Sequence, residues 1–280
     1  MYLFFPQWQG SGATDEVYHG ARLVRESLPT TINFVEVPVK LLHPVTLENN
    51  IWGYSVLVEQ LESACATLKQ HNPAQIFSVG GDCTCEIAPV SFLNQHYQGD
   101  LAVVWFDAHA DMNTPESSPS KTLHGMPLRT LLGEGDPHMV QSMFSTLSPR
   151  QVFLVGAREF DPDEERYIQA HQVSLFSPDT IARNPQNLID TIANAGFNNL
   201  YIHFDFDVID PAEFPYTAFP TANGLSIAQL MTVLDMLRAH FNIAGFSLLE
   251  LVPGDNPSLA AIEPILSLFS SFADEGIKNG

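Results

Sequence analysis

The stretch "LAVVWFDAHAD", residues 101–111, joins an apolar run to a group of polar residues. Apolar residues that do not alternate with polar ones are typical of a strand covered on both faces, as in a parallel sheet. In open parallel sheets, ligands bind beyond the carboxyl ends of the strands. The stretch therefore predicts a buried strand that ends at a functional site containing Asp107, His109 and Asp111.

Other apolar runs along the chain have the same character. They are "INFVEV" (32–37), "QIFSVG" (75–80), "QVFLVG" (151–156), "VSLF" (173–176), "LYIHFD" (200–205) and "IAGFSLL" (243–249). Between them, apolar residues at helical spacing predict helices over 48–70, 186–195, 226–240 and 257–273. This alternation predicts one α/β domain over residues 1–280, with a doubly wound, mostly parallel sheet. Residues 112–122, rich in Pro, Ser and Thr, are interpreted as a long loop.

The composition argues against several classes of function. The chain of 280 residues carries 32 acidic and 12 basic side chains, a net charge of -20. This charge argues against nucleic acid and anionic membrane surfaces as partners, and it suits a small cationic substrate or divalent metals. Three cysteines are too few for a disulfide framework and favour a reducing, cytoplasmic setting. No apolar run is long enough to span a bilayer, and the first residues lack the basic segment of a secretory signal.

The strand ends predict a metal centre. Asp107, His109 and Asp111 alternate, and alternate residues of an extended segment point the same way. Asp205 and Asp207 follow another run with the same period. Four carboxylates and an imidazole that converge would repel one another without cations. Such a set suits Mn²⁺ better than Mg²⁺ or Zn²⁺, and it favours two ions ~3.5–4 Å apart. Taken singly, each residue is also compatible with a loop cap or a turn former.

Three motifs resemble those of the arginase–agmatinase family, the ureohydrolases. They are "DAHAD" (107–111), "HGMPL" (124–128) and "FDFDVIDPAEFP" (204–215), in the order in which the family has them. The likeness covers most of the chain and is closest to the arginases. It implies a three-layer α/β/α sandwich around a mostly parallel sheet of about eight strands. It also implies a homo-oligomer, a trimer or hexamer, and hydrolysis of arginine to urea and ornithine by hydroxide held between two Mn²⁺ ions.

The resemblance also implies roles for single residues. The implied metal ligands are Asp107 and Asp205 as bridges, His109 and Asp207 at one ion, and Asp111 with Cys83 at the other. Glu250 would pair with the guanidinium group, His124 would carry a proton to the departing amine, and Asp111 counts among the catalytic residues. Asn113 and Ser120 would hold the substrate α-carboxylate, and Asp161, with Glu164 nearby, the α-amino group.

One position departs from the family pattern. In "GGDCTCE" (80–86), Cys83 stands where the family has a metal-ligating histidine. Three interpretations are open. Cys83 ligates as a thiolate and shifts the preference toward Zn²⁺ or Fe²⁺; it does not ligate, and one site is weak or empty; or the chain is a metal-poor relative with a binding or scaffold role. Cys85 is interpreted as a packing residue. His203 is interpreted as a packed core histidine rather than a ligand, although it lies near the predicted metals.

Two further departures border the predicted substrate site. "LVP" at 251–253 lacks the family's asparagine, and Asn223 replaces a glycine in "TANGLS" (221–226). Agmatine, guanidinobutyrate and formiminoglutamate therefore stay alternatives to arginine as the substrate.

Overall fold

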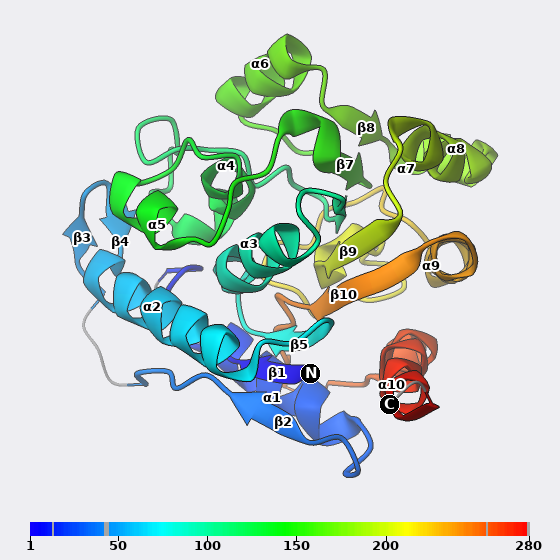
Figure 1. Ribbon diagram of the computed structural model, residues 1–280, viewed down its shortest axis with the longest axis horizontal. Helices are drawn as coiled ribbons and strands as arrows, with labels where there is room; N and C mark the ends of the chain where they lie inside the picture. Colours follow the sequence, from blue (N-terminus) through cyan, green and yellow to red (C-terminus); the bar gives the residue numbers. More distant parts are fainter. Residues whose placement is uncertain (13, 42–44, 256, 279–280) are drawn as a thin grey trace.

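A parallel sheet forms the middle layer of the molecule (Figure 1). The structure, a computed structural model, describes residues 1–12, 14–41, 45–255 and 257–278. Within these residues the large sheet has 8 strands in the order β2-β1-β5-β10-β9-β6-β7-β8. The strands are β1 (Tyr2–Phe5), β2 (Phe34–Glu36), β5 (Ile76–Gly80), β6 (Ala102–Phe106), β7 (Val152–Val155), β8 (Ser174–Phe176), β9 (Asn199–Phe204) and β10 (Asn242–Leu248). Every paired neighbour in this sheet runs parallel, so the predicted fold class is confirmed.

Helices cover both faces of the sheet (Figure 1). One layer consists of α2 (Tyr54–His71), α3 (Ile87–His96), α4 (Pro127–Leu131), α5 (Pro137–Ser142) and α6 (Pro162–His171). The other layer consists of α1 (Glu16–Ser27), α7 (Pro178–Arg183), α8 (Gln186–Ala195), α9 (Ile227–His240) and α10 (Glu263–Lys278). Two apolar clusters separate the layers, because alternate strand residues face opposite sides: Val103 and Trp105 join the first, Val104 and Phe106 the second.

The sequence prediction missed one strand and misplaced the start of one helix. It missed β1, a short run of 4 residues that Pro6 follows, although β1 pairs with both β2 and β5. The predicted helix over 48–70 begins only at Tyr54, because a hairpin of β3 (Leu47–Glu48) and β4 (Ile51–Trp52) precedes it. Asn49 and Asn50 form the hairpin turn with φ of 51° and 59°, a left-handed conformation that asparagine tolerates.

The other predicted elements are present and differ from the prediction only at their ends, and the structure adds several helices. The predicted helix over 257–273 begins at Glu263, since Pro264 suits a first helical turn, and a 3₁₀ turn at Ala260–Ile262 precedes it. Residues 112–122 form a loop without regular structure, as predicted. The short helices α4, α5 and α7 and the polar helices α1 and α6 were not predicted. Across the described ranges, no helix combines the length and apolar character that crossing a membrane requires.

Four strands at the centre of the sheet position the site. β5, β10, β9 and β6 are consecutive neighbours, so their carboxyl ends open on one edge. The chain leaves β5 through Gly81, where a Cβ atom would lie 1.8 Å from the carbonyl oxygen of Gln7. This close approach requires glycine and brings Cys83 directly to the edge of the sheet.

Candidate metal centre and active site

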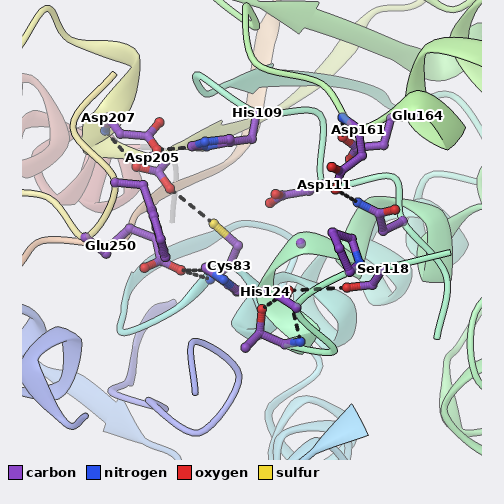
Figure 2. A pocket seen from close by; sticks show the side chains of 17 residues that line it. Cys83, His109, Asp111, Ser118, His124, Asp161, Glu164, Asp205, Asp207 and Glu250 are labelled. Atoms are coloured by element: carbon purple, nitrogen blue, oxygen red, sulfur yellow. Dashed lines mark hydrogen bonds and ion pairs between the residues drawn. The ribbon is translucent and has the colours of Figure 1, made fainter. Parts of the chain in front are cut away.

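A cavity of about 300 Å³ lies beyond the carboxyl ends of the central strands (Figure 2). Cys83 begins the 3₁₀ turn η1 (Cys83–Glu86) after β5, and Glu250 follows β10. Asp107 follows β6, and Asp205 begins the turn into η4 (Phe206–Val208) after β9. The edge predicted from parallel-strand geometry is therefore the edge at which these side chains meet.

The first group of possible ligands, here called the His109 side, consists of Asp107, His109 and Asp207, whose ligand atoms lie within 4.8 Å of one another. His109 Nδ1 is 3.4 Å from Asp107 Oδ1 and 3.0 Å from Asp207 Oδ2. Arg158 donates to the carbonyl oxygens of Asp207 and Thr221 at 2.8 and 2.6 Å. This guanidinium ties the Asp207 turn to the loop that covers it.

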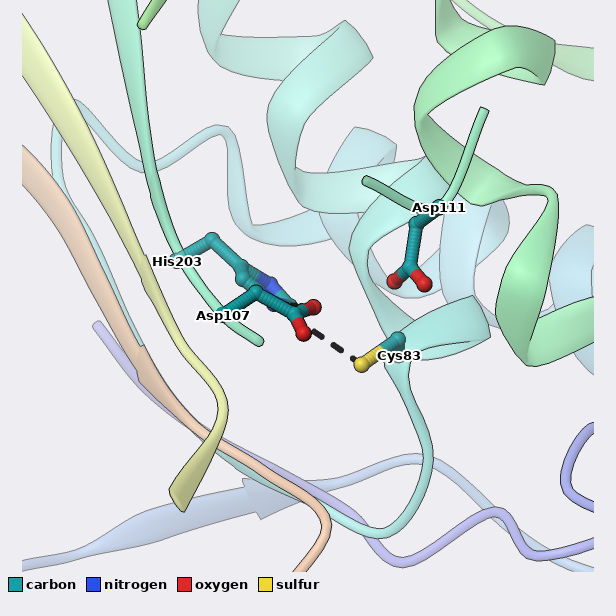
Figure 3. Close-up of side chains that lie close together, drawn as sticks. All are labelled: Cys83, Asp107, Asp111 and His203. Carbon is teal, nitrogen blue, oxygen red and sulfur yellow. Dashed lines mark hydrogen bonds and ion pairs between the residues drawn. The ribbon is translucent and has the colours of Figure 1, made fainter. Parts of the chain in front are cut away.

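The second group, here called the Cys83 side, consists of Cys83, Asp111 and His203, again with Asp107, and its ligand atoms also lie within 4.8 Å of one another (Figure 3). Cys83 Sγ also lies 3.4 Å from Asp205 Oδ2. Asp111 has a φ of 54°, and its buried Oδ2 atom has no hydrogen-bond partner among the described residues. Aspartate adopts this left-handed backbone more readily than most residues, and sparsely populated backbone conformations cluster at functional sites.

The electrostatics of this cluster fit divalent cations. Burial raises the pKa values of Asp111 and Asp205 well above the usual range, and the charge of Asp107 raises both further. Burial also opposes ionisation of Asp107, but its bonds to His109 and His203 outweigh burial and lower the pKa of Asp107. Buried carboxylates this close together repel one another, and a cation at each group would remove that repulsion. The residues present therefore fit two metal ions.

Glu250 and His124 form a pair at the wall of the cavity. Glu250 Oε1 accepts a hydrogen bond from the backbone N–H of Cys83 at 3.0 Å and lies 3.2 Å from His124 Nδ1. Burial lowers the pKa of His124, but the bond to Glu250 and the charge of Glu250 outweigh it, so the net shift is upward. Glu250 Oε2 is buried and finds no hydrogen-bond partner in the described part of the chain. It is available to a donor that enters the cavity.

The outer wall of the cavity carries the predicted substrate-binding residues. Asn113 Nδ2 donates to Asp161 Oδ2 at 2.8 Å, so these two candidates lie in contact. Glu164 accepts from the backbone N–H groups of Asp161 and Met112 at 2.8 and 2.9 Å, which fixes the start of α6 against the residue that follows Asp111. Ser120 also lines the cavity.

The structure thus brings the predicted site residues to one cavity and its floor. It also adds some that sequence reasoning missed: Ser118, Thr122 and Phe219 line the cavity, and Phe219 is 51% exposed at its mouth. These are ordinary loop residues, and no motif marks them. Asp210 accepts from the backbone N–H groups of Ala212 and Gly224, which is the geometry of a turn residue.

Cys85 and His203 both pack as predicted. Cys85 is 2% exposed and donates to the carbonyl oxygen of Phe5 at 3.0 Å, and all three cysteines are free thiols. His203 is fully buried and stacks on Trp105, with ring centroids 3.5 Å apart. The sequence prediction placed His203 near the metals but did not count it as a ligand, and the structure brings its imidazole into the Cys83 side.

Comparisons with known proteins agree with this fold. The model of the arginase family matches residues 14–269. An arginase of Staphylococcus aureus is 31% identical over 202 residues, which cover 70% of this chain and 67% of that one. The crystal structure of Entamoeba histolytica arginase in complex with L-ornithine superposes with a TM-score of 0.84 at 22% identity and 97% coverage of both chains. Formimidoylglutamase from Bacillus subtilis superposes with a TM-score of 0.72 at 17% identity, covering 100% of this chain and 87% of that one.

Proposed function

The chain belongs to the arginase family, and from that premise we propose that it hydrolyses the guanidino group of arginine, or of a closely related guanidino compound, to release urea. The observation that carries the proposal is the contact between Asn113 and Asp161 on the wall of the cavity whose floor holds the two ligand groups. An amide and a carboxylate side by side match the α-carboxylate and α-amino groups of an amino acid.

Two divalent cations, when bound, make water acidic enough to supply a nucleophile near neutral pH. Asp107 and Asp205 would contact both ions, His109 and Asp207 one of them, and Asp111 with Cys83 the other. Mn²⁺ at the His109 side is the expected ion, because carboxylate and imidazole ligands suit it.

Glu250 orients the guanidinium group in this proposal. Its free Oε2 atom accepts from one arm of the planar fork, while Oε1 stays bound to the backbone of Cys83. Water adds to the guanidino carbon, the bond from this carbon to the chain nitrogen breaks, and the two products are urea and an amine. His124 lies against Glu250 and carries the proton that the departing nitrogen needs.

Three substrates test the assignment of the outer wall. Arginine has an amine and a carboxylate, agmatine has only the amine, and guanidinobutyrate has only the carboxylate. For Asp161→Ala we expect KM to rise about 10–100-fold for arginine and agmatine, because one charge-assisted hydrogen bond to the amine is lost. For guanidinobutyrate, which has no amine, we expect KM to stay unchanged. For Asn113→Ala we expect the rise for arginine and guanidinobutyrate only. Urea release under steady-state conditions is the measurement.

The proposal fails if the purified chain releases no urea from arginine, agmatine or guanidinobutyrate with Mn²⁺, Zn²⁺, Co²⁺ or Fe²⁺. Formiminoglutamate belongs in the same assay, because it separates a guanidino hydrolase from a hydrolase that acts on a formimino group.

A second candidate function rests on Cys83 alone. If this residue cannot replace a ligating histidine, the chain is a metal-poor relative that binds a ligand or partner. Elemental mass spectrometry separates the two: two ions per chain support the hydrolase, and none supports the binding protein. The trimer or hexamer that the resemblance implies and the cytoplasmic location that the cysteine count favours stay predictions.

A further inference from the structure

His203 occupies a position that packing alone does not explain. Its side chain points from β9 to the same face of the sheet as Trp105, and Asp205 follows two residues later on the same side of the strand. Nε2 of His203 lies 3.7 Å from Cys83 Sγ and 3.5 Å from Asp107 Oδ2. Figure 3 shows Cys83 on η1, Asp107 and Asp111 on the segment after β6, and His203 on β9 lying close together.

The other nitrogen of His203 faces a buried carboxylate. Nδ1 is 3.6 Å from Glu86 Oε2, and neither atom has a hydrogen-bond partner within the described ranges. Both side chains are fully buried, so no bulk water satisfies them. Metal-ligating histidines typically present their second ring nitrogen to a carboxylate, which fixes the tautomer and orients the ring. Glu86 is placed to do this for His203.

Several contacts hold this arrangement in place. The His203 ring lies parallel to Trp105, with 6° between the planes. Trp105 in turn donates from Nε1 to Asp107 Oδ2 at 3.1 Å, and Tyr201 donates to Glu86 Oε1 at 3.3 Å. The same 3₁₀ turn, η1, supplies both Cys83 and Glu86, so the candidate sulfur ligand and the carboxylate that orients the imidazole move as one unit.

We infer that His203 is a metal ligand of the Cys83 side, where it acts with Cys83, Asp107 and Asp111 to form a sulfur–nitrogen–carboxylate site. The inference builds on the metal centre of the proposed function. His203 supplies, from inside β9, an imidazole that the turn after β5 lacks. A thiolate and an imidazole select Zn²⁺, Co²⁺ or Fe²⁺ over Mn²⁺, whereas the His109 side has only carboxylate and imidazole ligands. The two sides therefore differ in metal preference.

Cobalt(II) is the probe for this site, because bonds from thiolate to cobalt give a charge-transfer band in the near ultraviolet. Metal-free protein is titrated with Co²⁺ and then with Zn²⁺ as a competitor. We expect one of two bound equivalents to produce the band, and Cys83→Ser to abolish it. His203→Phe keeps a ring against Trp105 but removes the ligand. It should weaken cobalt binding at the Cys83 side by more than ~100-fold and change the visible spectrum of any cobalt that still binds.

Further variants separate a ligand from a packing residue. Glu86→Gln should weaken the same site by a smaller factor, ~10–100-fold, because it changes only the orientation of the imidazole. His138→Phe is the matched control: His138 is exposed and its ring pairs with Glu62, away from both ligand groups, so cobalt binding should not change. If His203→Phe binds cobalt with the affinity and spectrum of the unaltered protein, His203 is not a ligand.

X-ray absorption on the zinc-loaded, unaltered protein tests the inference even if His203→Phe does not fold. Sulfur in the zinc shell, together with two imidazoles for the two zinc ions of a chain, supports the inference. A shell without sulfur, or with only one imidazole for the two ions, overturns it. A thiolate–cobalt band in a chain that hydrolyses no guanidino compound would keep this site and overturn the proposed function. Urea release with Mn²⁺ in a chain without such a band would keep the proposed function and overturn this site.

Discussion

The His109 side and the Cys83 side share Asp107 but are built differently. On the His109 side, every candidate ligand follows the end of a strand, in a loop or a 3₁₀ turn. On the Cys83 side, one candidate ligand, His203, lies inside β9, and a thiol stands at the end of β5. The difference teaches that a metal site at one sheet edge can take its ligands either from the turns after the strands or from inside a strand.

The largest expected effect comes from Asp107, which belongs to both groups of ligands. Asp107→Asn should weaken metal binding on both sides by more than ~100-fold, because it removes a charged ligand from each. Asp207→Asn should do so only on the His109 side. Elemental mass spectrometry of protein purified by gel filtration measures ions per chain, with Asp210→Asn as the control outside the cluster. Retention of both ions by Asp107→Asn would contradict the shared role.

Cys83→His should make the two sides alike in the kinds of atoms that they offer to a metal. An imidazole in place of the thiol gives both sides only nitrogen and oxygen donors, so we expect Mn²⁺ affinity at the Cys83 side to rise at least ~10-fold and the preference for Zn²⁺ to fall. Competition between Mn²⁺ and Zn²⁺, followed by calorimetry, measures both. Cys65→Ser, a buried thiol on α2, is the control. An unchanged Mn²⁺ affinity would show that residue 83 does not limit the site.

The contrast between the sides also explains what the sequence could predict. Asp107, His109 and Asp207 follow long apolar runs, so strand recognition and the alternation of side chains were enough to bring them together. β1 escaped detection because only 4 residues precede Pro6. The hairpin before α2 escaped because Leu47, Ile51 and Trp52 continue an apolar pattern that also fits a helix.

Spacing places His203 near the metal centre, two residues before Asp205, but it does not predict a ligand there and does not single out Glu86. A histidine in an apolar strand is more often a packed residue, and His203 does pack on Trp105. The approach of His203 to Cys83 and Glu86 depends on β9 lying two strands from β5, and no local sequence pattern contains this sheet order. Likewise, the contact between Asn113 and Asp161 joins positions 48 residues apart.

Arg158 supports only the His109 side, and its removal should have a moderate effect. Its guanidinium donates to the carbonyl oxygens of Asp207, Thr221 and Ala222, which hold the η4 turn and the covering loop together. Arg158→Ala should therefore weaken metal binding on the His109 side about 10-fold and leave the thiolate–cobalt band of the Cys83 side unchanged. Arg166→Ala, on the exposed face of α6, is the matched control. An equal loss on both sides would contradict this separation.

The one expected effect on stability rather than on metal binding concerns Glu164, which supports the Asp111 end of the Cys83 side. Burial raises the pKa of Glu164 to about 7, although hydrogen bonds from the backbone of Asp161 and Met112 oppose the shift. Because the folded-state pKa lies above the ordinary value of 4.5, the folded chain binds the proton more tightly than the unfolded chain. The stability that this proton contributes is present at low pH and is lost as the pH rises through about 7.

In the metal-free protein, we therefore expect the free energy of unfolding to fall by about 2 kcal/mol more in the unaltered chain than in Glu164→Gln between about pH 5 and pH 8. Chemical denaturation at a series of pH values measures the difference. Glu165→Gln removes the same charge from an exposed position on α6 and should follow the unaltered chain. If Glu164→Gln and Glu165→Gln show the same pH dependence, Glu164 is not protonated in the folded state, and the Asp111 end carries one more negative charge than the structure implies.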